Sequence, residues 1–220
     1  MQRYEQKENR MTQLDFIGTQ PTQKEEEQFN LWDRDGKPTK IRTDIDFQQV
    51  DALFNSFDRK EVERYEKYWE GVAPKNDTEI FHRWLFAFMS VHTTWERNVI
   101  GYEAIKDWTV WFNDDEKLMD IIVGARVGLH NNRTRFIGEF ARKFWDNPEN
   151  YKYQGNDWQK FRNRLVKEIL GLGIAKVSFA LEMIYPNRAR VTCMDTHLFQ
   201  AFGLDQSKDA TRYKDIENYW

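Results

Sequence analysis

The feature that most constrains the fold of this chain is a glycine-rich turn between two helical patterns. The turn, Leu170-Gly171-Leu172-Gly173, separates a pattern over 157–169 from a second pattern over 174–185. In the second pattern, apolar residues recur at steps of three and four. Pro186 ends it, because proline cannot continue the hydrogen-bond ladder of a helix. The sequence therefore predicts two helices joined by a short turn, a helix-hairpin-helix.

The two glycines of this turn give the hairpin a surface that can meet a ligand. Glycine lets the backbone turn tightly and approach another molecule closely, and Leu172 between them is predicted to anchor the turn in the core. Free N–H groups at the start of the second helix can donate to phosphate oxygens. Such contacts hold DNA without reading its sequence. Three basic residues of the first helix support this interpretation: Arg162, Arg164 and Lys167.

The rest of the chain also follows the helical period. Helices are predicted from Asp46 onward, over 61–70, from a cap at Asp77 or Thr78 to Met89, and over 96–112, 115–124 and 132–145. No two alternating strand patterns are joined by a hairpin turn. The predicted fold class is all-α. Residues 1–45 are rich in Gln, Glu and Lys without a sustained period, which predicts a flexible N-terminal arm.

The charge of the chain is unevenly distributed. The formal net charge is −3, yet residues 126–190 contain 13 Lys and Arg against 6 Asp and Glu. A basic segment in an acidic protein is typical of a surface that binds phosphates. The alternative is a set of solvated helix faces that bind nothing.

Several classes of protein are excluded or disfavoured by composition. No apolar run approaches the ~18 residues that a membrane-spanning helix needs. The opening MQRYEQKENRMTQ lacks the apolar stretch of a secretion signal, so we expect an intracellular protein without membrane contact. Cys193 is the only cysteine, which rules out an intrachain disulfide and a cysteine-ligated cluster within this chain.

Asp195 follows the hairpin at a position that predicts a helix start. Val191 to Met194 lead to it, and Thr196-His197-Leu198 opens a helix that ends at Gly203. An aspartate here has an ordinary explanation as a helix N-cap, worth about 1 kcal/mol. The other explanation is a carboxylate presented to a ligand at the helix start.

The order Gly171-Leu172-Gly173, Lys176, Pro186, Asp195-Thr196-His197 resembles the signature of the endonuclease III (HhH-GPD) superfamily of DNA glycosylases. Residues 88–93 resemble the family's Leu-Leu-Ser-Ala-Gln helix end, whose polar residue fills the gap left by a flipped base. Gly128-Leu129 resembles the family's turn before a basic helix, here with Arg133 and Arg135. The resemblance covers about 78–203.

This resemblance implies a fold and an activity. It implies a two-lobed helical fold, with a central lobe of 79–184 that contains the hairpin (157–185) and a second lobe of 46–78 plus 185–220. It implies an N-glycosylase of base excision repair that acts as a monomer on duplex DNA with a damaged or mispaired base. Asp195 would be the catalytic carboxylate and Lys176 the candidate lyase nucleophile. The implied DNA contacts are Gly171, Leu172, Gly173, His92, Arg133, Arg135, Arg162, Arg164 and Lys167.

No metal or other cofactor is required by this chemistry, because a carboxylate can stabilise the positive charge that develops on the sugar. The resemblance allows a monovalent cation at the hairpin turn and excludes the iron–sulfur cluster of some members, whose cysteines are missing.

Three positions depart from the family pattern. Leu170 replaces the proline before the first glycine, and His92 replaces the usual Gln or Asn. The family's lysine comes two residues after the second glycine, where this chain has Ala175; Lys176 lies about 100° further around the helix. Base removal is thus better supported than strand cleavage. A non-catalytic helix-hairpin-helix DNA-binding protein and a helical interaction protein stay as alternatives, and the base removed is not specified.

Overall fold

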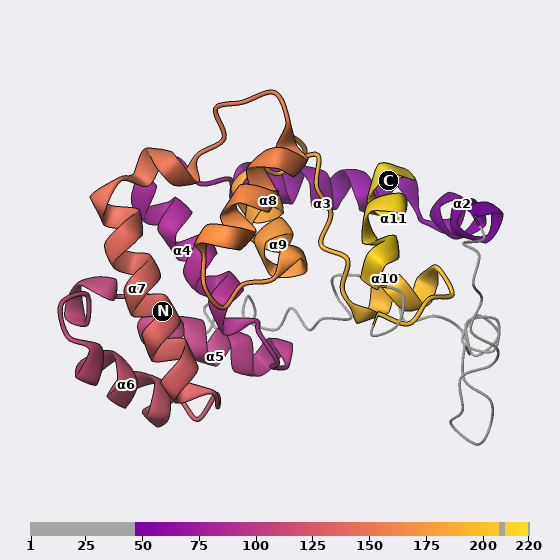
Figure 1. The fold of residues 1–220 in the computed structure, drawn as a ribbon. Coiled ribbons are helices and arrows are strands. Elements are labelled where there is room, and N and C mark those ends of the chain that lie inside the picture. Colours follow the sequence, from indigo (N-terminus) through magenta and orange to yellow (C-terminus); the bar gives the residue numbers. More distant parts are fainter. Residues whose placement is uncertain (1–46, 207–209, 220) are drawn as a thin grey trace, which may run out of the picture. The chain divides into compact units, whose positions relative to one another are not determined.

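The computed structural model describes residues 47–206 and 210–219, which form helices, turns and loops without a strand (Figure 1). The chain divides into two compact units. One consists of residues 65–193, and the other combines 194–220 with the chain up to residue 64. The boundaries therefore lie at 64/65 and 193/194, rather than at 78/79 and 184/185 as expected. The N-terminal arm expected over 1–45 lies outside the described residues.

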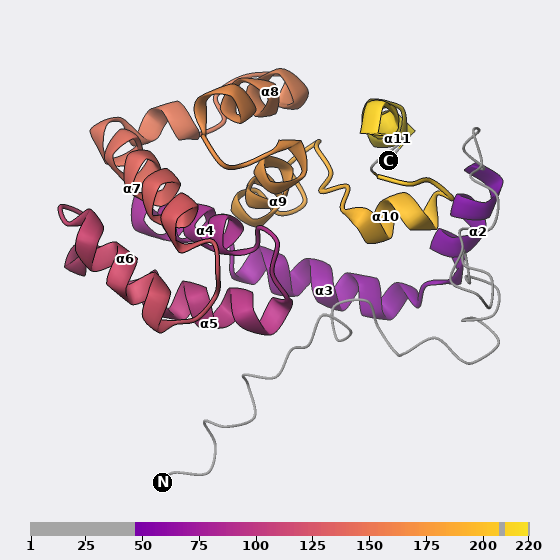
Figure 2. The same ribbon diagram turned by 60° about the horizontal axis from the view of Figure 1, so that its bottom comes forward.

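The helices of the larger unit follow the predicted patterns closely. The unit begins within α3 (Arg59–Gly71), which crosses its boundary, and continues through helices that alternate with short loops (Figure 2). These are α4 (Asp77–Met89), α5 (Trp95–Ile105), η1 (Trp108–Val110), α6 (Asp115–Gly124), α7 (His130–Asp146), η2 (Pro148–Tyr151), α8 (Trp158–Glu168) and α9 (Ile174–Ile184).

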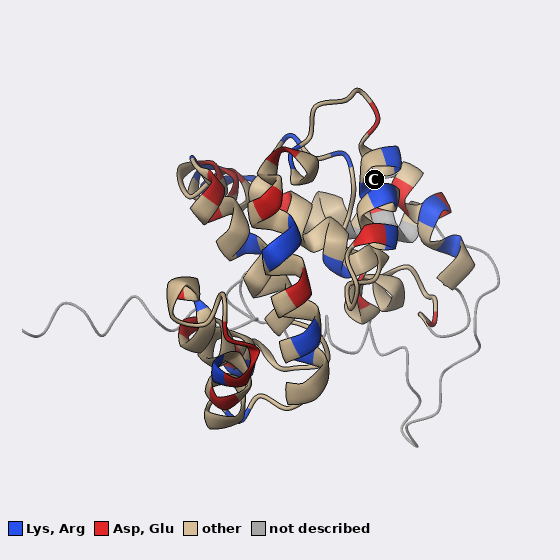
Figure 3. Cartoon of the chain, turned by 60° about the vertical axis from the view of Figure 1, so that its left-hand side comes forward, with Lys and Arg blue, Asp and Glu red and all other residues tan. Residues whose placement is uncertain are grey.

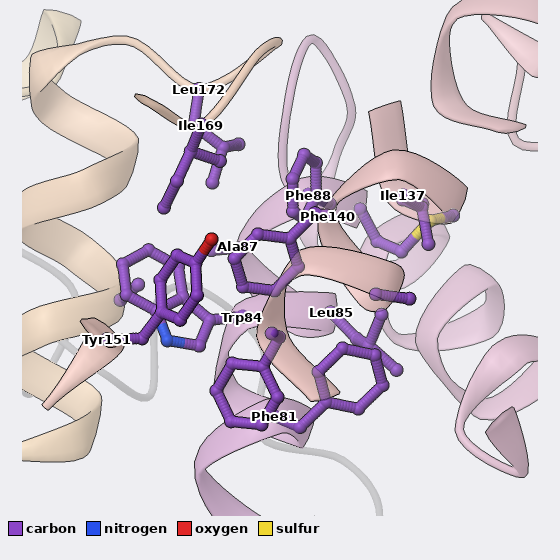
Figure 4. Close-up of a cluster of buried hydrophobic side chains, with 14 of the residues drawn as sticks. Phe81, Trp84, Leu85, Ala87, Phe88, Ile137, Phe140, Tyr151, Ile169 and Leu172 are labelled. Carbon is purple, nitrogen blue, oxygen red and sulfur yellow. The ribbon is translucent and has the colours of Figure 1, made fainter. Parts of the chain in front are cut away.

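Helix α4 forms the centre of this unit and contacts α5, α7 and α9. Seven of its thirteen residues are buried, among them Phe81, Trp84 and Phe88. Phe81 and Trp84 pack against Phe140 of α7 (Figure 4). The centroid of the Phe140 ring lies 6.0 Å from that of Phe81 and 5.6 Å from that of Trp84. Burial of aromatic side chains on this scale makes the largest contribution to the stability of such a core.

The start of α4 differs from the expectation by one residue. Asn76 is the N-cap, not Asp77 or Thr78: its side-chain oxygen accepts from the Glu79 N–H at 2.9 Å. The Glu79 carboxylate in turn accepts from the Lys75 N–H at 2.7 Å. This reciprocal pair resembles a capping box, and it fixes where the central helix begins.

The helix predicted over 96–112 is divided into two. Helix α5 ends at Ile105, and the short helix η1 covers Trp108–Val110. The buried indole N–H of Trp111 donates to the Ile105 carbonyl at 2.8 Å, which satisfies a carbonyl group that a continuing helix would have used. The sequence pattern does not reveal this break, because apolar residues that enter the core, Ile105 and Trp111, lie on both sides of it.

The other unit contains α2 (Phe47–Ser56), the start of α3, α10 (Thr196–Ala201), η3 (Ala210–Arg212) and α11 (Tyr213–Tyr219). Phe199, Tyr213 and Ile216 are buried. The Tyr213 hydroxyl accepts from the Met194 N–H at 3.3 Å. This contact holds the segment that leads into α10 against α11.

Candidate nucleic-acid interface

The hairpin turn between α8 and α9 needs glycine at its first glycine position. Gly171 has a φ of +87°, and a Cβ atom there would lie 2.3 Å from the Phe136 ring of α7. Leu172 is buried and points into the core beside Ile169, as Figure 4 shows. The turn is therefore fixed on its inner side by Leu172 and Phe136. Its outer side is formed by exposed backbone at Gly171 and Gly173.

Among the α-helices from α4 to α10, two begin without a side-chain cap. Of the helices α4 to α10, five have an N-cap side chain that accepts from a backbone N–H. The exceptions are α9, which follows Gly173, and α7, which follows Leu129. The first backbone N–H groups of these two helices therefore have no N-cap side chain as an acceptor. Both helix starts can therefore donate to an anionic ligand.

Gly173, unlike Gly171, could be replaced by a larger residue without a clash. Its φ is −81°, and an added Cβ would meet no atom within 4 Å. A side chain would fit the fold there but would project into the space in front of the α9 start. Glycine at this position thus keeps the backbone N–H groups accessible, and the geometry of the turn does not require it.

Arg133 does not lie on the surface, contrary to its expected role as a DNA contact. Its side chain is 3% exposed, and its guanidinium donates to four carbonyl groups. Two belong to the turn after α4, those of Met89 at 3.1 Å and Val91 at 2.7 Å. The other two, of Val127 and of Gly128 at 2.8 Å, belong to the turn before α7. A guanidinium so enclosed cannot reach a phosphate.

Two of the residues that follow these carbonyl groups are non-glycine residues with a left-handed backbone conformation. His92 has a φ of 49° and Leu129 a φ of 52°, and both side chains are exposed. Left-handed conformations cost non-glycine residues energy and persist where the surrounding structure imposes them. Leu129 was not among the predicted contacts. The sequence shows a Gly-Leu pair but not an exposed leucine, 45% accessible, at the start of a helix.

Arg162, another predicted DNA contact, does not lie on the surface either. It is fully buried between the two hairpin helices, where Nη1 donates to Ser178 Oγ at 3.0 Å and Nε to Asn163 Oδ1 at 2.9 Å. Its position three residues before Leu165, which is also buried, places it on the inner face of α8. The residue thus joins α8 to α9.

The remaining basic residues of α8 lie outside the core but in different surroundings. Arg164 is paired with Glu168 at 2.6 Å and also donates to the Asn150 carbonyl. Lys167 is exposed and lines an open hollow of about 400 Å³ beside the hairpin. The hollow is also lined by Glu139, Asp146 and Glu168, and by Lys143, which is paired with Glu139. Its excess of carboxylates makes it a poor place for a phosphate.

Arg135 is an exposed basic residue that contacts the aromatic ring beside the hairpin glycine. Its Cζ lies 4.6 Å from the centroid of the Phe136 ring, the ring that Gly171 approaches. Elsewhere Lys and Arg are interspersed with Asp and Glu over the helices (Figure 3). Lys143 pairs with Glu139 and Arg142 with Asp115, so part of the positive charge of 126–190 is neutralised locally.

Asp195 belongs to the other unit and is the N-cap of α10. Its Oδ1 accepts from the Leu198 N–H at 3.0 Å, whereas Oδ2 has no partner within the described part of the chain. Gln206 braces the helix start, because its amide accepts from the Thr196 hydroxyl at 2.7 Å. The carboxylate is half-buried, so it is held in place with one oxygen available.

Lys176 lies in the first turn of α9 and is half-buried. Its Nζ is 5.6 Å from the centroid of the Phe179 ring on the same helix. Ala175, at the position of the family's lysine, carries no nucleophile. The helix begins at Ile174, so the one-residue offset of Lys176 is not absorbed by a shifted helix start.

Solved structures of DNA glycosylases are similar to this chain. No family model and no curated protein matches the sequence. The 8-oxoguanine DNA glycosylase of Methanocaldococcus jannaschii matches the structure with a TM-score of 0.62 at 20% identity, over 78% of this chain and 81% of that one. This chain has the helix-hairpin-helix DNA glycosylase fold.

A second solved structure agrees. The 8-oxoguanine glycosylase/lyase of the same organism, in complex with a 15mer DNA containing 8-oxoguanine, matches with a TM-score of 0.61 at 19% identity. The match covers 78% of this chain and 84% of that chain. In the described residues of our protein, no helix has the length and apolar character to cross a membrane.

Proposed function

We propose that this protein is a DNA N-glycosylase that removes a damaged or mispaired base. One observation carries the proposal: in a chain with this fold, Asp195 begins a helix after the hairpin and keeps one carboxylate oxygen without a partner among the described residues. An N-cap alone requires one oxygen. The second is available to stabilise charge on a sugar.

The chemistry assigns a task to each group. As the C1′–N bond breaks, positive charge develops on the deoxyribose and the base leaves with the bonding electrons. The Asp195 carboxylate stabilises that charge and orients a water molecule, whose oxygen bonds to C1′. The proton that this water loses ends on the departing base, which carries the electrons of the broken bond. The base must first leave the stack, which costs a few kcal/mol. His92 and Leu129 fill the gap, and this filling offsets part of that cost.

The phosphates are held mainly by backbone groups. The uncapped starts of α9 and α7 donate N–H groups, and Arg135 adds a side-chain cation beside the hairpin. Arg133 and Arg162 act within the core instead. Arg164 and Lys167 contribute only where the phosphate backbone extends over α8.

Oxidised guanine is the first substrate to test, since both similar solved structures are of 8-oxoguanine glycosylases. The assay uses duplex oligonucleotides with single lesions: 8-oxoguanine, an oxidised pyrimidine, uracil, an alkylated adenine and a mismatched adenine. Alkali cleaves the strand wherever a base has been removed.

Asp195→Asn separates the two roles of this aspartate. Asparagine caps a helix as well as aspartate does, so the thermal stability should be unchanged, whereas loss of the negative charge should lower the rate of base removal about a hundredfold or more. Asp157→Asn, at the N-cap of α8, is the matched control and should retain full activity. Equal activity of Asp195→Asn and the wild type would refute the catalytic assignment. Tight duplex binding without base removal would favour a non-catalytic DNA-binding protein.

A further inference from the structure

Arg133 is a buried cation that joins two separate turns of the larger unit. Its four acceptors come from the turn after α4 and the turn before α7, which are about forty residues apart in the sequence. Among the described residues it has no carboxylate partner. A guanidinium presents its donors in a fixed planar fork, so it fixes the spacing of the carbonyl groups that it binds.

The left-handed residues of the larger unit concentrate around this fork. The described chain has four non-glycine residues with positive φ: His92, Arg126, Leu129 and Asn187. His92 and Leu129 each come directly after a carbonyl group that Arg133 binds. Arg126 precedes Val127, and its own carbonyl accepts from Arg97 Nη1 at 2.9 Å. Backbone strain that clusters in this way is a sign of a functional constraint.

These contacts fix the backbone that carries the His92 and Leu129 side chains. Both side chains are exposed, and neither needs its left-handed backbone for packing in the core. The backbone positions from which a polar and an apolar side chain project are therefore tied to each other through Arg133. Insertion into a duplex is favourable when the inserted groups are already ordered, since less conformational entropy is lost on binding.

We propose that Arg133 is a positioning residue that couples His92 and Leu129 so that they enter the DNA together. The proposal rests on the proposed function, because it needs a gap in the duplex for the two side chains to fill. Arg133 touches neither DNA nor the reacting atoms. Arg133 raises the preference for a gapped duplex over an intact one, and it does not change the general affinity for phosphates.

The test measures gap selectivity with the full chain. The probe is a duplex in which one nucleotide is replaced by a tetrahydrofuran abasic analogue, and the reference is the intact duplex of the same sequence. The ratio of the two dissociation constants reports insertion, and the intact duplex alone reports phosphate contacts. Arg133→Lys retains the charge but cannot hold four carbonyl groups, and it should lower the ratio about tenfold while the affinity for intact duplex stays unchanged.

A double-mutant cycle distinguishes positioning from general structural support. In the wild-type background, His92→Ala and Leu129→Ala should be non-additive in gap selectivity by about threefold or more. In the Arg133→Lys background the two effects should become additive. Arg142→Ala, on the same helix but paired with Asp115 on its exposed face, is the matched control and should leave both the ratio and the coupling unchanged.

A milder variant keeps the proposal testable if Arg133→Lys fails to fold. Arg97→Ala removes a single bond from the exposed side of the same turn, and it should lower the ratio about threefold. An unchanged ratio in every folded variant would overturn the role of Arg133 while the proposed function stands. A wild-type protein that does not prefer the abasic duplex would overturn both.

Discussion

At the scale of single residues, the two glycines of the hairpin turn have separate roles. Gly171 has a positive φ and lies against Phe136, so the fold requires it. Gly173 has an ordinary φ and open space around it, so the fold does not. The fold thus requires the first glycine, whereas the second keeps the backbone at the start of α9 open to a ligand.

Alanine substitution should separate these roles. Gly171→Ala should lower the free energy of unfolding by about 2 kcal/mol or more, because a strained φ and a clash with Phe136 add together. Gly173→Ala should cost only about 0.5 kcal/mol as a poorer N-cap. Its methyl group should still lower duplex affinity about tenfold by blocking a charge-assisted hydrogen bond. Thermal unfolding and fluorescence anisotropy measure the two effects. A Gly173→Ala protein that binds DNA normally would contradict the proposed phosphate contact.

The sequence predicted the hairpin, the buried Leu172 and the capping position of Asp195, because these depend on local period and spacing. It could not separate buried from exposed arginines. Arg133 and Arg135 are two positions apart on one helix, and only the position of α4 decides that the first faces inward to the Met89 and Val91 carbonyls. The left-handed conformations of His92 and Leu129 depend on the same tertiary contacts.

At the scale of elements, the register of α9 determines which chemistry its lysine can perform. The helix begins at Ile174, and Lys176 extends toward Phe179 on its own surface. The position that the resemblance assigns to a nucleophile is Ala175. Under the proposed function, base removal by water would then use the Asp195 carboxylate and no amine.

Variants that move the lysine test this argument. Lys176→Ala should leave the rate of base removal within about threefold of the wild type, as expected for a side chain that makes a single cation–π contact. The combination of Ala175→Lys with Lys176→Ala moves the amine about 100° around α9. This combination should produce an adduct with lesion DNA that borohydride traps, whereas the wild type should not. A trapped wild-type adduct that disappears in Lys176→Ala would instead establish Lys176 as a lyase nucleophile.

Most boundaries at this scale were predictable, and the exceptions have local causes. The start of α4 depends on hydrogen bonds in both directions between Asn76 and Glu79, which compete with the equally plausible cap at Asp77. The break after α5 depends on the Trp111 indole, which finds the Ile105 carbonyl only once both are buried. Periodicity detects neither. Residues 75–79 are all polar and do not mark the start of α4, whereas apolar residues continue across the break after α5.

At the scale of the whole molecule, net charge is a poor guide to function. The chain has a net charge of −3, yet its proposed partner is a polyanion. The sequence showed a basic segment over 126–190, but Arg142, Lys143 and Arg164 of this segment are paired with carboxylates. Basic and acidic residues also alternate over the helices in Figure 3. Binding then depends on a few well-placed groups rather than on a broad positive surface.

Few phosphate contacts should give a moderate dependence of affinity on salt. Each contact from a side-chain cation adds about 0.9 to the slope of log K against log[salt], so Arg135→Ala should reduce the slope by about 0.9. Arg142→Ala removes the same charge from the same helix, but its guanidinium is paired with Asp115 at 2.9 Å and should leave the slope unchanged. Titration of a labelled duplex between low and moderate salt measures both. Equal reductions in the two variants would mean that net charge governs binding, and the proposed interface around the hairpin would then lose its support.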